Sequence, residues 1–114
     1  MLSEGLRRLL FFKSCVLSNE NSMILMEEPE SYLFPYYISN FAESLGMMED
    51  SNQYLIATHN IYFLQSLIEK TKEKDLNVFI TYIKDGVTRV RDLSNAEVGS
   101  LMEEDPFLKI SSMQ

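Results

Sequence analysis

The sequence of 114 residues has a single cysteine, Cys15, and no long apolar run. One cysteine excludes a disulfide within the chain and is typical of a reducing compartment. No segment approaches the ~20 apolar residues that cross a bilayer, and the N-terminus lacks the ordered charged, apolar and small-residue regions of a signal peptide. We therefore expect a soluble, cytoplasmic chain that does not interact with a membrane.

Glycine and basic residues are also scarce. The four glycines occur nowhere in the pattern G-x-x-x-x-G-K-[ST], so the chain has no loop of this kind to surround a phosphate. The 10 Lys and Arg are outnumbered by 17 Asp and Glu, which gives a formal net charge of -7. Because a domain that grips a phosphate backbone is usually basic, direct nucleic-acid binding is not expected.

Enough apolar sequence is present for a folded core. Apolar residues make up 46% of the chain, which argues against wholesale disorder. The length is that of one small domain or of a piece of a larger one.

Apolar periodicity and turn residues predict helices that alternate with strands. Strands separated by helices are typical of parallel pairing, so the expected fold class is α/β, with a mostly parallel sheet flanked by helices and a C-terminal β-hairpin. Both apolar strands are expected to be buried, the first of them on both faces. The predicted elements are a helix over 4–17 capped by Ser3, a strand over 23–26, a helix from Pro35 ended by Gly46, a strand over 53–57, a helix over about 61–74 capped by Asn60, a hairpin of 77–84 and 87–93 around Asp85-Gly86, and a short helix opened by a capping box of Ser94 and Glu97. Residues 103–114 show little periodicity and are expected to form a frayed tail.

Polar side chains follow both apolar strands. Glu27 and Glu28 come after the first strand, and Thr58-His59-Asn60 follows the second. Because parallel strands end at the same sheet edge, these groups are expected to lie together, where open α/β sheets place ligands. A carboxylate there can orient Mg²⁺ through water, a second can activate an attacking water, and a neutral histidine can contact a phosphate oxygen.

A less specific interpretation fits the same residues. Adjacent glutamates after a strand most often form a solvated turn, and a lone histidine there is most often a cap or a surface residue. An independent metal-dependent hydrolase would need further ligands, and Asp, Glu and His do not cluster elsewhere at metal spacing. The residues by themselves leave a solvated turn and a reactive site equally favoured.

Four short motifs, taken in order, resemble soluble AAA-type, ABC-like ATPases, which include the overcoming-lysogenisation-defect group and abortive-infection ATPases. Each motif alone is weak, but the ordered set over residues 2 to 60 is specific. The motifs are L-S-E-G at 2–5 followed by Arg7, resembling the signature; M-I-L-M-E-E-P-E at 23–30, resembling the Walker B strand; S-Y-L-F-P at 31–35, resembling the loop after it; and I-A-T-H-N at 56–60, resembling the switch-histidine loop.

The resemblance implies a role for each candidate residue. Glu27 matches the acid that supports Mg²⁺, Glu28 the catalytic glutamate that polarises water, and His59 the switch histidine that contacts the γ-phosphate. Ser3 and Gly5 match signature residues that, in a head-to-tail dimer, contact nucleotide bound to the other subunit. A helix that starts at Ser3 offers free N–H groups to an anion, which agrees with this role.

The resemblance also implies that the loop with Glu30, Ser31 and Leu33 lies at a dimer interface. Residues 1–102 match the C-terminal half of an ABC-like ATPase domain, without its Walker A loop, and 103–114 form a C-terminal tail. The expected fold is therefore a partial P-loop NTPase lobe.

Without a Walker A lobe, the chain is expected to be inactive alone and to use ATP and Mg²⁺ only when that lobe is supplied. It is then a C-terminal fragment, one half of a split ATPase, or a non-enzymatic interaction module derived from one. The expected partner is a second copy or a chain that carries the Walker A lobe. The missing strands would leave a sheet edge and an apolar face bare.

Overall fold

The computed structural model describes residues 3–103 and 106–114, apart from the side chains of 106–109. The chain forms two compact units, an N-terminal unit of Met1–Lys70 and a C-terminal unit of Thr71–Gln114.

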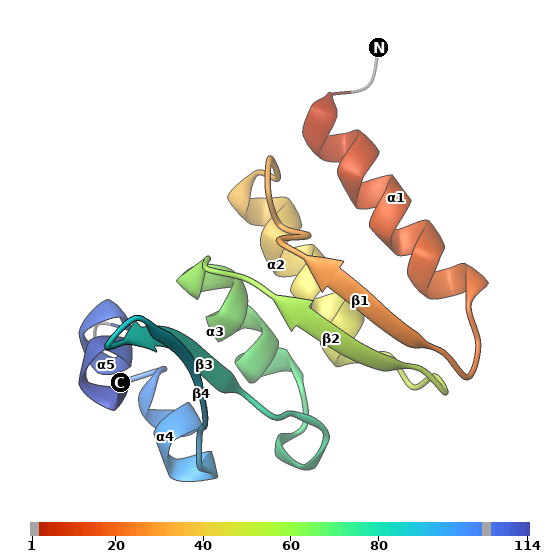
Figure 1. The fold of residues 1–114 in the computed structure, drawn as a ribbon. Helices are drawn as coiled ribbons and strands as arrows, with labels where there is room; N and C mark the ends of the chain where they lie inside the picture. Colours follow the sequence, from red (N-terminus) through yellow and green to blue (C-terminus); the bar gives the residue numbers. More distant parts are fainter. Residues whose placement is uncertain (1–2, 104–105) are drawn as a thin grey trace. The chain divides into compact units, whose positions relative to one another are not determined.

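A parallel pair of strands organises the N-terminal unit (Figure 1). Met23 lies opposite Gln53 and Glu27 opposite Ala57 along the pair, so the predicted parallel pairing through an intervening helix is confirmed. The elements are α1 (Glu4–Ser18), β1 (Met23–Glu27), α2 (Pro35–Gly46), β2 (Gln53–Ala57) and α3 (Ile61–Lys70).

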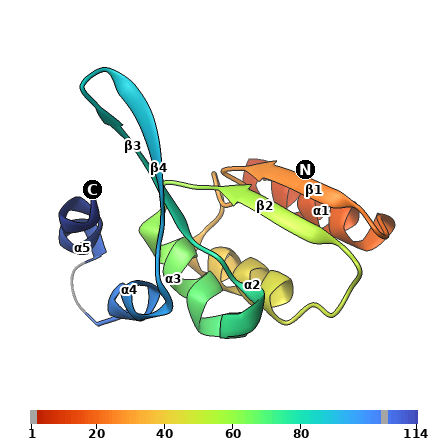
Figure 2. The ribbon, with the colours of Figure 1, turned by 60° about the horizontal axis from the view of Figure 1, so that its bottom comes forward.

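All three helices of this unit lie on one face of the strand pair (Figure 2). Strand side chains alternate between faces, and Met26 reaches the core that the helices form. Phe41 of α2 and Phe63 of α3 stack in that core with ring centroids 6.1 Å apart, and both are almost fully buried. The remaining buried members of this core are Leu9, Val16, Leu33, Ala42, Leu45 and Leu67.

The opposite face of the strand pair is open. Met23, Leu25 and Leu55 expose 62%, 68% and 59% of their surface there. The predictions that β1 is covered on both faces and that β2 is buried are therefore wrong, because the described helices of this unit cover one face only. The prediction that an apolar face would be bare is confirmed. We call Met23, Leu25 and Leu55 the open face.

Helix boundaries in this unit follow the predicted caps with two exceptions. Ser3 Oγ accepts from the N–H of Leu6 at 3.2 Å, and Asn60 Oδ1 accepts from the first turn of α3. Gly46 is the last helical residue and not the cap, since Met47 closes α2 in the right-handed region. Helix α3 ends at Lys70, short of the predicted end, because the next five residues carry no apolar side chain to bury.

The C-terminal unit contains the predicted hairpin. The strands are antiparallel, with Lys84 opposite Val87, and Asp85 and Gly86 both have positive φ (54° and 75°), as a type I′ turn requires. Helix α5 lies where a frayed tail was expected, so that prediction is wrong. The elements are a 3₁₀ turn η1 (Glu73–Asp75), β3 (Phe79–Lys84), β4 (Val87–Asp92), α4 (Asn95–Ser100) and α5 (Pro106–Met113).

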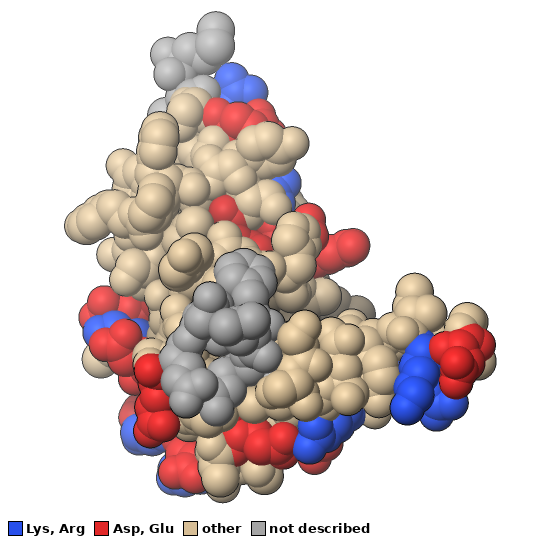
Figure 3. All heavy atoms as spheres, turned by 90° about the vertical axis from the view of Figure 1, so that its left-hand side faces the viewer, with Lys and Arg blue, Asp and Glu red and all other residues tan. Residues whose placement is uncertain are grey.

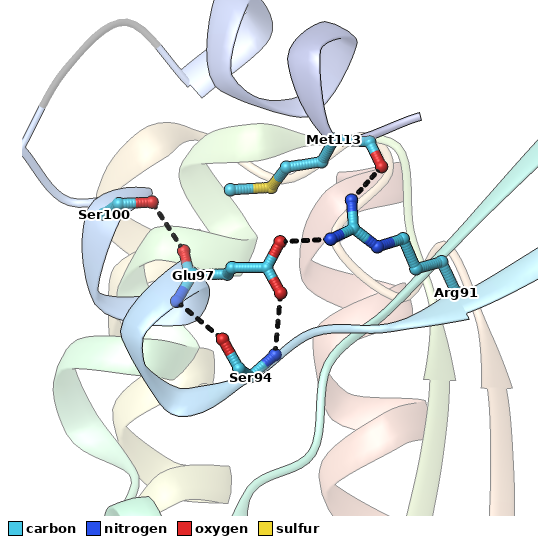
Figure 4. A network of polar contacts seen from close by, with 5 residues as sticks. All are labelled: Arg91, Ser94, Glu97, Ser100 and Met113. Atoms are coloured by element: carbon cyan, nitrogen blue, oxygen red, sulfur yellow. Dashed lines mark hydrogen bonds and ion pairs between the residues drawn. The ribbon is translucent and has the colours of Figure 1, made fainter.

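Arg91 joins three elements of this unit (Figure 4). From β4, its guanidinium donates to Glu97 Oε2 in α4 at 2.7 Å and to the carbonyl of Met113 in α5. Ser94 and Glu97 form the predicted capping box, in which each side chain accepts from the other residue's N–H. These contacts place a charge-assisted network at the start of α4.

Acidification is expected to weaken this unit through Glu97. The N–H of Ser94, its hydroxyl and the Arg91 guanidinium hold the pKa of Glu97 below its usual 4.5. Because the pKa of Glu97 is lower in the folded protein than in the unfolded chain, its carboxylate contributes fully to stability when the pH is above the unfolded pKa of 4.5. This contribution is lost as the pH falls from 4.5 through the lower pKa of the folded protein. Glu97→Gln keeps a neutral acceptor for the capping box and removes the titration.

The measurement is thermal unfolding of both proteins from about pH 6 to about pH 2.5, a range that brackets the transition. The stability difference between wild type and Glu97→Gln should shrink as the pH falls. A difference that stays constant over this range contradicts the prediction.

Candidate functional site

The two acidic residues at the end of β1 lie beside the end of β2. The N–H of Glu28 donates to the carbonyl of Ala57 at 2.7 Å, which extends the ladder by one bond beyond Glu27. The predicted meeting of the two polar strand ends at one sheet edge is confirmed. Glu28 has a φ of 46°, a left-handed conformation that is uncommon for a residue with a long side chain.

His59 contacts Glu28 across this edge. Its Nδ1 lies against Glu28 Oε1, and the histidine side chain is 83% exposed against 39% for the glutamate. The contact is an ion pair when the imidazole is protonated. The two residues expected to be catalytic thus come together from separate strand ends, on a surface that a ligand can reach.

Glu27 is the last residue of β1 and is exposed. Strand alternation places it on the same side as Leu25, at the rim of the open face. Among residues 3–103 and 106–114, no group of three or more His, Cys, Asp or Glu could hold a metal ion by itself. The carboxylates of Glu27 and Glu28 suit Mg²⁺, which binds proteins through one or two carboxylates and takes other ligands from water and phosphate.

Ser3 caps α1 and Gly5 lies in its first turn, which packs against the loop after β1. A Cβ added at Gly5 would lie 2.3 Å from the carbonyl oxygen of Tyr32. The position therefore requires glycine for a close backbone approach within the unit. The contact of Ser3 and Gly5 with nucleotide stays a prediction.

Arg8 also joins α1 to this loop, and sequence reasoning missed it. Its guanidinium donates to the carbonyls of Ser31 and Glu28 at 3.0 and 3.1 Å. The rings of Phe12 and Tyr32 lie 5.4 and 5.6 Å from its central carbon. The main chain of the left-handed Glu28 is thus held from α1. No local pattern distinguishes Arg8 from Arg7.

Glu30 and Leu33 were expected in an interface loop, but both side chains are buried within the unit, at 4% and 9% exposure. These two side chains therefore pack inside the unit, and the interface position of the loop stays a prediction. Ser31 is half-buried and Tyr32 exposed, so part of the loop remains at the surface. Glu30 accepts a hydrogen bond from Thr58 Oγ, which links the two strand-end loops.

Surface charge is mixed on the face drawn in Figure 3, where blue Lys and Arg groups lie close to red Asp and Glu groups. Within the described part of the chain, no helix is long and apolar enough to span a bilayer.

Comparisons with known proteins agree with the fold. Residues 1–65 match a family model described as an AAA domain, putative AbiEii toxin, type IV TA system. A solved chain from work on the structural biochemistry of ATP-driven dimerization and DNA-stimulated activation of SMC ATPases superposes with a TM-score of 0.65 and 16% identity, over 90% of this chain and 60% of that one. A search of the curated proteins found no match. The fold is therefore that of a P-loop NTPase-like lobe, and this chain spans about 60% of the solved chain's length.

Proposed function

Since this chain belongs to the family of AAA domains described as the putative AbiEii toxin of type IV TA systems, we propose that it is a portion of an ABC-like domain that binds and hydrolyses ATP. It supplies the signature, Walker B and switch-histidine elements and is inactive alone. The observation that carries the proposal is the contact between Glu28 and His59, which come from neighbouring ends of parallel strands.

Each residue has a role that its position supports. Glu27, exposed at the end of β1, would hold Mg²⁺, which neutralises phosphate charge when bound. Glu28 accepts a hydrogen bond from the attacking water, which orients that water, and accepts its proton during the attack. The exposed His59 hydrogen-bonds a phosphate oxygen.

The signature elements lie at the start of α1. There Ser3 and Gly5 present the helix N-terminus to the nucleotide of a second subunit. The ATPase portion is proposed to span residues 1–102, with 103–114 as a tail.

A partner chain that carries a Walker A lobe must complete the site, and a second copy of this chain is the other proposed partner. The open face supports this, because parallel strands are almost always covered on both faces and Met23, Leu25 and Leu55 are not. The related SMC ATPase chain comes from work on ATP-driven dimerization, and we propose a comparable ATP-dependent association here.

The same open face favours a second candidate function, a non-enzymatic interaction module that keeps the fold and binds a partner through it. The two candidates differ in what Glu28 does. An ATPase requires its carboxylate, and an interaction module does not.

The test is ATP hydrolysis by the purified chain, alone and after co-expression with the Walker A lobe from the same or a neighbouring reading frame. We expect no measurable turnover alone, because no loop in this sequence surrounds the β-phosphate, and steady turnover with the lobe. Turnover by the chain alone, abolished in Glu28→Gln, would overturn the requirement for a lobe. A lobe that binds the chain without producing turnover would favour the interaction module.

A further inference from the structure

Glu30 is a buried carboxylate that the proposed chemistry does not use. It lies two residues beyond Glu28 and is 4% exposed. One carboxylate oxygen accepts from the hydroxyl of Thr58. The other, Oε2, is the one buried side-chain polar atom without a hydrogen-bond partner among the described residues.

The hydrogen bond to Thr58 continues along the histidine loop. Thr58 Oγ accepts from the N–H of Asn60 at 3.0 Å. Asn60 Oδ1 in turn accepts from Tyr62 and Phe63 at 3.0 and 3.1 Å at the start of α3. This chain of bonds holds the backbone on both sides of His59, so Glu30 lies at one end of the support for that residue.

Stability alone does not explain a carboxylate at this place. A buried carboxylate must lose its hydration, and one hydrogen bond with a second oxygen left unpaired compensates only part of that cost. An apolar side chain of similar volume would be tolerated as well or better. A role in placing the adjacent loop accounts for a costly group here.

We propose that Glu30 is a positioning residue, which through Thr58 holds His59 against the carboxylate of Glu28. That this places His59 to contact a phosphate rests on the proposed function. The placement of His59 against Glu28 does not depend on that function. Glu30 therefore couples the loop after β1 to the loop after β2.

Amide hydrogen exchange of Asn60 in the purified chain provides the first test. Thr58→Val keeps the side-chain shape but removes the hydroxyl, and should speed exchange at Asn60 about five- to tenfold, as expected for one lost hydrogen bond. Thr58→Ser keeps the hydroxyl and should stay within about twofold of wild type. Equal exchange in Thr58→Val and wild type would overturn the proposal.

Replacement of Glu30 provides the second test. Glu30→Leu removes both acceptors, so we expect faster exchange at Asn60 and shifted His59 ring resonances, while the melting temperature is unchanged or higher. Glu30→Gln keeps one acceptor and should restore both signals. A lower melting temperature with unchanged Asn60 exchange and His59 resonances would show a purely structural role and overturn the proposal. If Glu30→Leu does not fold, Glu30→Met, which also removes both acceptors, takes its place in the same measurements.

None of these measurements involves nucleotide. One pair of results is that the variants change Asn60 exchange as expected while the chain hydrolyses no ATP together with the Walker A lobe. That pair of results supports the positioning role of Glu30 and refutes the proposed function. Turnover without these exchange changes refutes only the positioning.

Discussion

Replacing Gly5 with alanine is expected to destabilise the N-terminal unit by about 2–3 kcal/mol, as overpacking of a tight contact does. The new Cβ would lie 2.3 Å from the carbonyl oxygen of Tyr32. That oxygen cannot retreat easily, because Tyr32 is itself left-handed, with a φ of 67°. Alanine is favoured over glycine within a helix by ~1 kcal/mol, so the steric clash should outweigh the gain in helix propensity.

Gly99 offers a matched control with the opposite sign. It lies in α4, and a Cβ there would meet nothing within 4 Å, so Gly99→Ala should stabilise the C-terminal unit by about 0.5–1 kcal/mol. Urea unfolding, followed by the amide exchange of residues in each unit, measures the stability change that each substitution causes in its own unit. A Gly5→Ala protein as stable as wild type would contradict the close packing of α1 on the loop after β1.

Glu28→Gln is expected to lower kcat of the completed ATPase by ~10²–10⁴-fold, the usual contribution of a general base. The amide has nearly the shape of the carboxylate but cannot accept a proton from water. Binding of ATP does not depend on that proton, so KM should change little. The measurement is steady-state hydrolysis by the chain together with its Walker A lobe.

Glu20→Gln is the control for loss of one carboxylate, because Glu20 is exposed in the loop before β1. Its kcat should equal that of the wild type. If Glu28→Gln leaves kcat unchanged as well, Glu28 is not the general base of the hydrolysis.

Local chemistry made much of the fold predictable. Asp85-Gly86 specifies a hairpin turn, Asn60 and the pair of Ser94 and Glu97 specify helix starts, and each acts within four residues. The meeting of Glu28 and His59 followed from one rule about parallel strands, because the two residues follow the ends of neighbouring strands in the same sheet.

Features made by residues distant in sequence could not be predicted. Arg8 and Glu28 are brought together by the packing of α1, and Glu30 and Thr58 come from two different strand ends. Neither pair is marked by a recognisable spacing of residues in the sequence. The open face was predicted only from the absence of a lobe, since Leu25 and Leu55 are as apolar as any buried strand residue.

The left-handed backbone at Glu28 sets a local cost for the side chain at that position. Glycine and asparagine adopt a φ of 46° with less strain than glutamate does. Replacing Glu28 with asparagine should therefore relax the main chain after β1 and add slightly to stability while it removes the proposed general base, an exchange of activity for stability that is common at functional sites.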